Sequence, residues 1–139
     1  MADVDPVSGV AIFLGAGCGA LLRWWLGIAL NPLFPALPPG TLAANVLGGL
    51  LMGFLLGALL PFSSLPPALR LALTTGFLGG LTTFSTFSAE TLDLLTKQDY
   101  PWAVAHVLAH VLLSLLAAWS GWIVARQLLG LLGPGAASG

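Results

Sequence analysis

The sequence predicts an all-α integral membrane protein with four transmembrane helices, the third of which is broken near its middle. Hydrophobic residues make up 58% of the 139 residues and charged residues only 6%, against about 25% in an ordinary soluble domain. The mean hydropathy is +0.99. A chain this short buries only part of its surface when it folds, so this much apolar side chain argues against a soluble globular enzyme.

The composition argues against other classes of protein as well. A net charge of −1 offers no attraction to the phosphate backbone, so no nucleic-acid partner is expected. The single cysteine, Cys18, allows no intrachain disulfide and no thiolate metal site. Residues 1–6 are acidic where a secretory signal is basic, so we expect the first hydrophobic stretch to be a span that is not removed.

Proline punctuation divides the chain into stretches long enough to cross the hydrocarbon layer, which takes about 20 residues. The expected spans are about residues 7–30, 40–60, 67–97 and 101–126. They are bounded by Asn31-Pro32, Pro61, Pro66-Pro67 and Pro101. We expect a single four-helix transmembrane domain over residues 1–132, followed by a flexible tail over residues 133–139.

The first two spans carry small residues at helical spacing. The second span has a stripe of period four, formed by Thr41, Asn45, Gly49, Gly53 and Gly57. The first span has glycines close together, at positions 15, 17 and 19. Small residues let helix backbones approach one another in lipid. The stripes pack either within the chain or on a second copy, and we expect some of them to face a second copy.

The basic residues are balanced across the membrane. If the loops alternate sides, Arg23 and Lys97 belong to one side and Arg70 and Arg126 to the other. Membrane orientation is set by an excess of Lys and Arg on the cytoplasmic side. The equal division therefore favours insertion in both orientations.

The third span differs from the others in its glycine and hydroxyl content. Residues 76–80 contain three glycines, and residues 82–88 contain five hydroxyl side chains. Glycine weakens a helix by about 1 kcal/mol relative to alanine, and Ser and Thr offer the backbone other partners. A break at this depth leaves backbone carbonyls for a cation and a helix N-terminus for an anion. The alternative is a continuous helix rich in Gly and Thr.

The first, second and fourth spans also carry polar side chains within the membrane. Asn45 lies inside the second span, and Arg23 lies in the last third of the first, where it either serves the site or reaches the headgroups. His106, His110 and Ser114 repeat every four residues on the fourth span. We expect no metal at the two histidines, because neither a carboxylate nor a cysteine accompanies them on that helix.

These donors suit an anion. The first two spans contain no Asp or Glu, whereas proton-coupled cation export needs a membrane carboxylate. Asn45 offers an amide, Ser85 and Thr86 offer hydroxyls, and Phe84 and Phe87 offer positively polarised ring edges. Fluoride is the small, strongly hydrated anion that needs so many donors.

Residues 76–88, GFLGGLTTFSTFS, resemble the signature of the CrcB/Fluc fluoride channels, and residues 15–23 and 40–48 resemble that family's first two helices. The resemblance implies an antiparallel, dual-topology homodimer with two fluoride pores in a prokaryotic plasma or inner membrane. It also implies a structural sodium ion held by the backbone carbonyls of Gly79 and Thr82.

By motif position, Asn45, Phe84 and Phe87 would line the fluoride route and Arg23 would sit at an aqueous vestibule. The polar track of the fourth helix would map onto His106, His110 and Ser114. Family members often carry Tyr or Ser at the first two of these positions, so the histidines are a departure. The alternatives are a small multidrug-type antiporter and a non-transporting assembly subunit.

Overall fold

The computed structural model describes residues 5–59 and 65–132, and every regular element within them is a helix. The elements are α1 (Pro6–Leu30), η1 (Asn31–Leu33), α2 (Pro39–Leu59), α3 (Pro67–Leu71), η2 (Ala72–Leu78), α4 (Gly79–Leu81), α5 (Phe84–Thr96) and α6 (Tyr100–Leu132). The tail predicted at residues 133–139 and the predicted end of the second span at residues 60–61 lie outside the described residues.

The long helix α1 begins at a side-chain cap and ends at the predicted residues. Asp5 accepts hydrogen bonds from the backbone N–H of Val7 and from the N–H and hydroxyl of Ser8. The Ser8 hydroxyl and these two amides hold the pKa of Asp5 below its ordinary value. At the far end Asn31 is the C-cap and Pro32 follows it, as expected of a residue that cannot continue the helix.

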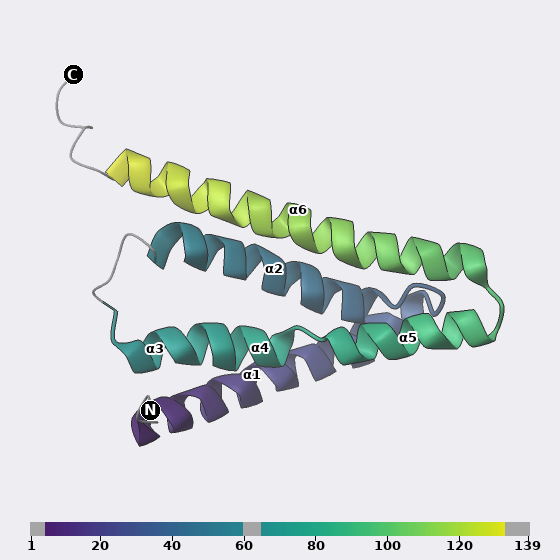
Figure 1. The fold of residues 1–139 in the computed structure, drawn as a ribbon, viewed down its shortest axis with the longest axis horizontal. Coiled ribbons are helices and arrows are strands. Elements are labelled where there is room, and N and C mark those ends of the chain that lie inside the picture. The colour runs from purple at the N-terminus through teal and green to yellow at the C-terminus, as the bar shows by residue number, and fades with distance from the viewer. Residues whose placement is uncertain (1–4, 60–64, 133–139) are drawn as a thin grey trace.

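The third segment is discontinuous, which confirms the predicted break (Figure 1). The helical backbone runs through α3, the π-helical η2 and α4 to Leu81. Thr82 and Thr83 are then extended, with ψ of 152° and 115°, before α5 starts. Thr83 ends the break as the N-cap of α5, because its Oγ1 accepts the backbone N–H of Thr86 at 3.1 Å. The glycines before it stay helical.

Those glycines bring the third segment close to α1. A Cβ on Gly76 would lie 2.7 Å from the carbonyl oxygen of Ile12, and one on Gly80 would overlap the carbonyl of Ala16. Backbone contact of this kind is available only to glycine. The glycine signal in the sequence therefore marks helix packing, and the hydroxyl signal marks the break.

The glycine stripe of α2 packs against α6 of the same chain. A Cβ on Gly49 would lie 2.6 Å from the carbonyl oxygen of Ser114, and one on Gly57 would lie 2.7 Å from the Cβ of Ala125. Gly53 is packed as closely against the backbone of α6. The expectation that some of the small-residue stripes face a second copy therefore does not hold for this stripe, and for the other it stays a prediction. Close approach within the chain accounts for the stripe of α2.

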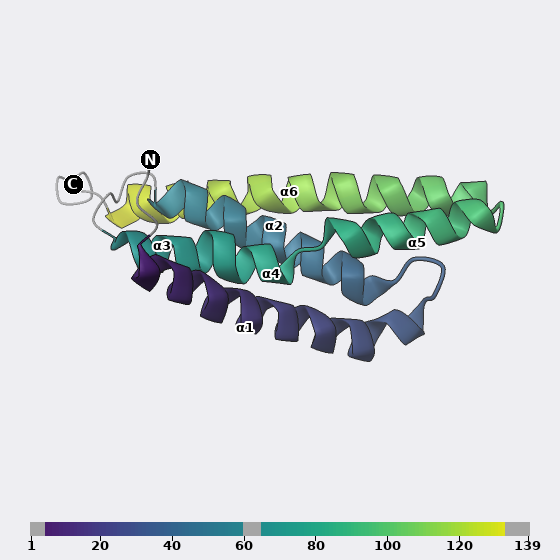
Figure 2. The same ribbon diagram turned by 60° about the horizontal axis from the view of Figure 1, so that its bottom comes forward.

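The bundle is elongated, with α1 along one side, α6 along the other, and α2 and the third segment between them (Figures 1 and 2). Among the described residues, three helical stretches are long and apolar enough to cross a membrane: Pro6–Leu33, Pro39–Ala58 and Tyr100–Gly130. The third segment is divided at the break, so neither of its halves reaches that length on its own.

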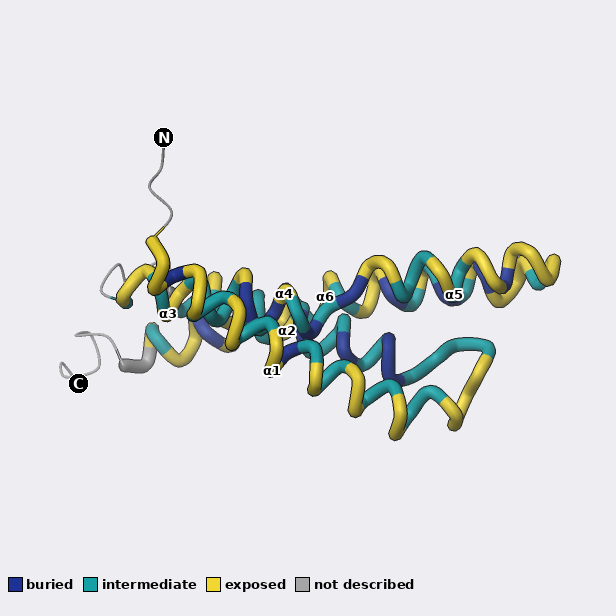
Figure 3. The backbone as a smooth tube through the Cα atoms, turned by 90° about the horizontal axis from the view of Figure 1, so that it is seen from below, coloured by how far each residue is buried: buried dark blue, intermediate teal, exposed yellow. Residues whose placement is uncertain are grey.

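The outer surface is apolar and the interior is small. Phe13 is 75% exposed and Trp119 is 64% exposed, and exposed positions run along the outside of the bundle (Figure 3). In the part of the chain that the structure describes, the cluster of buried apolar side chains consists of Ala44, Leu78 and Leu81. This arrangement suits a protein whose outer surface is covered by lipid rather than water.

Candidate functional site

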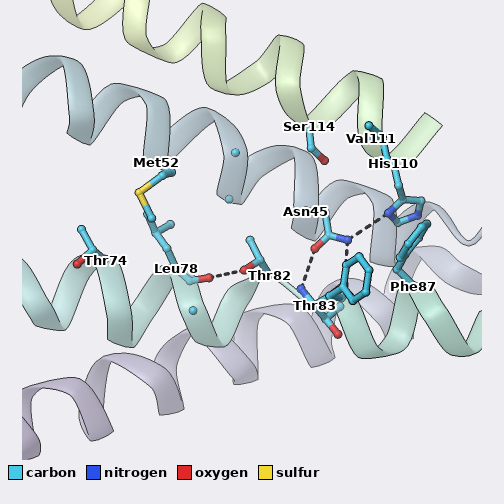
Figure 4. Close-up of a pocket in the computed structure, with 14 residues that line it drawn as sticks. Asn45, Met52, Thr74, Leu78, Thr82, Thr83, Phe87, His110, Val111 and Ser114 are labelled. Atoms are coloured by element: carbon cyan, nitrogen blue, oxygen red, sulfur yellow. Dashed lines mark hydrogen bonds between the residues drawn. The ribbon is translucent and has the colours of Figure 1, made fainter. Parts of the chain in front are cut away.

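Asn45 on α2 bridges the break in the third segment (Figure 4). Its Oδ1 accepts the backbone N–H of Thr83 at 2.7 Å, and its Nδ2 donates to the carbonyl of the same residue at 3.1 Å. An extended residue between two helices has no helical partners for these groups, and in lipid they must be satisfied inside the protein. The amide of Asn45 supplies the missing partners, and the double contact fixes which end of the amide is the oxygen.

The orientation of Asn45 determines the state of His110. Nδ2 of Asn45 lies 3.1 Å from Nδ1 of His110. Because Nδ2 can only donate, Nδ1 must accept, and the hydrogen of the neutral ring is then on Nε2. Among the described residues, Nε2 of His110 and Oγ of Ser114 are buried and have no hydrogen-bond partner. The site therefore holds two buried donors that have no acceptor.

A cavity of about 470 Å³ lies beside Asn45, and Figure 4 shows the residues around it. It is lined by α2, the third segment and α6. The predicted site residues that line it are Asn45, Gly79, Thr82, Phe84, Phe87, His110 and Ser114. The Phe84 ring is 80% exposed in the single chain, so the cavity is open at this side. His106 does not line this cavity and is completely buried.

Aromatic rings from α5 and α6 form a packed cluster next to this cavity. The ring centroids of Phe84 and Phe87 are 5.3 Å apart. Phe87 in turn stacks on His106, with centroids 5.4 Å apart and an interplanar angle of 13°, and the His106 and His110 centroids are 4.4 Å apart. Packing on three neighbours holds Phe87 in place, so its position relative to the donor on His110 is fixed.

A second cavity, of about 420 Å³, lies on the α1 side of the break and is lined by Arg23, Thr41 and Thr86 among others. Nε of Arg23 donates to the carbonyl of Gly80 at 3.1 Å. Arg23 is half-buried and binds the carbonyl of a residue just before the break. The guanidinium therefore places positive charge on the wall of this cavity.

The hydroxyls of Ser85 and Thr86 are separate from the first cavity. Thr83 Oγ1 accepts the backbone N–H of Thr86 at 3.1 Å and donates to Oγ1 of Thr86 at 2.9 Å. Oγ of Ser85 lies 3.3 Å from Oγ1 of Thr83. These contacts form the N-cap of α5. Thr86 lines the second cavity, and Ser85 lines neither of the two.

Thr41 and Glu90 form a polar contact that the sequence did not predict. Oγ1 of Thr41 donates to Oε1 of Glu90 at 2.7 Å, and the other oxygen of Glu90, Oε2, lies 3.5 Å from Nε2 of His106. The available sequence signal was the spacing of Phe87 and Glu90, three residues apart on one helix and hence on one face. Thr83, which Asn45 holds, was hidden among neighbouring hydroxyl residues.

The carbonyls predicted to bind sodium have lost their helical donors. In a continuous helix the carbonyl of Gly79 would accept the N–H of Thr83, and that of Thr82 would accept the N–H of Thr86. Those N–H groups instead donate to Asn45 and to Oγ1 of Thr83. Gly79 is also exposed. Two such oxygens fit a hard cation but are too few to hold one, so the residues fit sodium only where a second copy adds its own.

Comparison with known proteins identifies the family. The family described as "CrcB-like protein, Camphor Resistance (CrcB)" matches residues 10–122, which is most of the chain. The chain belongs to the CrcB family.

Similar curated proteins agree with this assignment. The fluoride-specific ion channel FluC of Aromatoleum aromaticum is 55% identical over 113 residues, which cover 81% of this chain and 86% of that protein. The proteins of the same name from Cupriavidus pinatubonensis and Nitrosospira multiformis are 54% and 52% identical over 118 residues. Each alignment covers 85% of this chain, and 94% and 92% of the respective relative.

The CrcB match includes the whole site. Its range, residues 10–122, runs from α1 into the second half of α6 and contains both cavities. Family membership and the apolar helices together make the chain a multi-pass membrane protein.

Replacing Asn45 by Ala should destabilise this CrcB-family protein. Both backbone groups of Thr83 would lose their partner, at about 1–3 kcal/mol for each buried unsatisfied group. We expect the midpoint of thermal unfolding in detergent to fall by more than about 5 °C. Ser120→Ala, at an exposed hydroxyl that bonds only its own helix, is the control. Equal midpoints for the two variants would contradict the bridging role of Asn45.

Proposed function

We propose that the chain is a fluoride-selective ion channel of the prokaryotic cell membrane that lets fluoride leave the cytoplasm passively and so reduces fluoride toxicity. The observation that carries the proposal is its identity of 52–55% with relatives named fluoride-specific ion channels, over more than four fifths of the chain. The proposed activity moves an ion and changes no bond, so the protein is not an enzyme.

The first cavity has the chemistry that fluoride needs. Fluoride is small and holds its water tightly, so a pore must replace that water with close donors. Nε2–H of His110 and the hydroxyl of Ser114 are buried donors without an acceptor, and the edges of Phe84 and Phe87 carry partial positive charge. Chloride is larger and gains less from the same donors, so it should pass poorly.

The role proposed for Asn45 follows from its hydrogen bonds. Both hydrogens of its amide already have acceptors, the carbonyl of Thr83 and Nδ1 of His110. Asn45 therefore serves the fluoride route by holding the break and by turning the donor of His110 to Nε2. This differs from the expectation that its own N–H is offered to the ion.

The remaining predicted residues extend the route on either side. Arg23, on the wall of the second cavity, supplies the positive charge of a vestibule that attracts anions. Thr86 lines the same cavity, and Ser85 precedes it in the first turn of α5. His106, stacked on Phe87, continues the polar stripe of α6 beyond His110.

A second copy of the chain would complete the site. Phe84 is 80% exposed in the single chain, and Gly79 is exposed on the same cavity. The basic residues also support an antiparallel pair. Helix α3, which contains Arg70, and the last turns of α6, which contain Arg126, lie at the end of the bundle opposite the connection from α5 to α6 (Figure 1). Lys97 is the C-cap of α5 and begins that connection. No side carries the excess that would fix one orientation.

In this dimer, a sodium ion would have a structural role. The carbonyls of Gly79 and Thr82 lack their helical donors, and a second copy would double the number of oxygens around one ion. The ion would satisfy these carbonyls and join the two broken helices.

The two competing functions have less support. The small multidrug-type antiporter needs an acidic residue on its transport route. None lies on α1 or α2, and Glu90 of α5 lines neither of the two cavities. The relatives reported above carry the channel name. A non-transporting subunit would have no use for the buried, unpartnered donors of the first cavity.

Fluoride release from liposomes tests the proposed function. Vesicles containing the protein should release fluoride, read by an ion-selective electrode, when a potassium ionophore is added, and should release little chloride. Phe84→Ile and Phe87→Ile keep the bulk but lose the ring edge. A loss of about 1.4 kcal/mol would lower the flux about tenfold.

Asn45→Asp should abolish the flux, because it places negative charge beside the route. Phe13→Ile, at a ring 75% exposed on α1, is the control and should keep full flux. Comparable chloride release, or full fluoride flux in both ring variants, would rule out this account of the site.

Labelling from the two sides of the membrane tests the antiparallel dimer. A cysteine is placed at residue 139 in a Cys18→Ala background, and an impermeant thiol reagent is added to intact cells and to opened membranes. Dual insertion predicts that about half of the cysteines react in each orientation. Cys18→Ala without the added cysteine gives the background. Labelling from one side alone would refute the antiparallel arrangement.

Crystals soaked in a heavier monovalent cation, such as thallium, test the sodium site. We expect one anomalous peak on the dimer axis, next to the carbonyls of Gly79 and Thr82. Thr82→Ser should keep the peak, because the ligand is a backbone atom and the hydroxyl that bonds Leu78 is retained. An axis without a peak would eliminate the site.

A further inference from the structure

Glu90, His106 and His110 form a cluster of metal-ligating groups at the edge of the proposed fluoride route. Glu90 comes from α5 and the two histidines from α6. One candidate ligand atom from each residue can be chosen so that all lie within 4.8 Å of one another. Helix α6, which carries both histidines, contains no Asp or Glu, but the fold supplies a carboxylate from the neighbouring helix α5.

The proposed fluoride route does not use every group in this cluster. Within the described part of the chain, Oε2 of Glu90 and Nε2 of His106 are buried without a hydrogen-bond partner. The His106 side chain is 0% exposed and that of Glu90 is 18% exposed. A carboxylate oxygen repels an anion, so fluoride cannot satisfy Glu90. Buried polar groups without a partner cost free energy, and a cation would remove that cost.

We propose that Glu90, His106 and His110 bind a divalent transition-metal ion of the Zn²⁺ type. Two imidazoles and one carboxylate are a known three-ligand set for zinc, which leaves the fourth tetrahedral position for water or an anion. Tetrahedral ligands about 2.0–2.2 Å from zinc lie about 3.4 Å from each other, and Oε2 of Glu90 is 3.5 Å from Nε2 of His106. The i, i+4 spacing of the histidines supplies the third ligand from the same face of α6.

The surroundings of Glu90 support a ligand role. Oε1 accepts the hydroxyl of Thr41 at 2.7 Å, which holds the carboxylate and leaves Oε2 facing His106. Metal ligands are commonly oriented by such outer hydrogen bonds.

Metal binding would disturb the fluoride route, a consequence that rests on the proposed function. If the metal binds Nδ1 of His110, it displaces the amide of Asn45, which lies 3.1 Å from that atom. If it binds Nε2, the ring hydrogen must move to Nδ1, where it meets the Nδ2 hydrogens of Asn45. The contact between Asn45 and His110 is lost in either case. Binding at Nε2 also removes the donor on that nitrogen, and binding at Nδ1 frees the ring from the amide that orients that donor. Bound metal therefore slows fluoride.

Calorimetry with Zn²⁺ tests the site without any measure of transport. The protein, in detergent, with any affinity tag removed and stripped with a chelator, should bind one Zn²⁺ per chain. Glu90→Gln and His106→Gln should each weaken binding at least about tenfold. Gln at position 90 still accepts the Thr41 hydroxyl, and an unchanged elution volume shows that a variant is folded. Asp93→Asn, at an exposed carboxylate three residues from Glu90 that pairs with Lys97, should bind as the parent does.

Liposome flux then tests the consequence for transport. Zn²⁺ should slow fluoride release from vesicles of the parent protein and of Asp93→Asn, and a chelator should restore it. Absent Zn²⁺ binding, or binding that Glu90→Gln and His106→Gln leave unchanged, would overturn the site. A protein that binds Zn²⁺ through these residues but releases no fluoride would keep the metal site and refute the proposed function instead.

Discussion

The double hydrogen bond between the Asn45 side chain and the backbone of Thr83 is the contact on which the rest of the site depends. A helix cannot be interrupted inside a membrane unless its free N–H and C=O groups find partners in the protein. One amide from α2 meets both groups of Thr83. Because that bond fixes the amide, it also fixes the tautomer of His110 and leaves a buried N–H without an acceptor.

Close helix packing holds this contact in place from both sides. Gly76 and Gly80 bring the third segment against the backbone of α1, and Gly49 and Gly53 bring α2 against α6. With the helices at backbone contact, the amide of α2 can reach the break, and rings from α5 can stack on the imidazoles of α6. The glycines thus determine the distances between the helices, and these distances allow the polar side chains to reach one another.

Much of the fold followed from local sequence signals. Prolines and the cap at Asn31 marked helix ends, and the run of Thr and Ser marked the break, since these signals act over a few residues. Contacts between helices were harder to predict. The stripe at Gly49 could pack within the chain or on a second copy, because periodicity shows which residues share a face and not what that face meets. Glu90 was missed for the same reason: its partners, Thr41 and His106, are on other helices.

The most direct test of the account is the tautomer of His110. Nitrogen-15 NMR of histidine-labelled protein in lipid, with His106→Gln used to assign the signals, reports which ring nitrogen carries the hydrogen. The account predicts a neutral ring protonated on Nε2, whose shift moves and saturates as fluoride is added, while the Nδ1 signal keeps the shift of an acceptor. A hydrogen on Nδ1, or an Nε2 chemical shift that stays constant as fluoride is added, would contradict the claim that Asn45 turns this ring toward the ion.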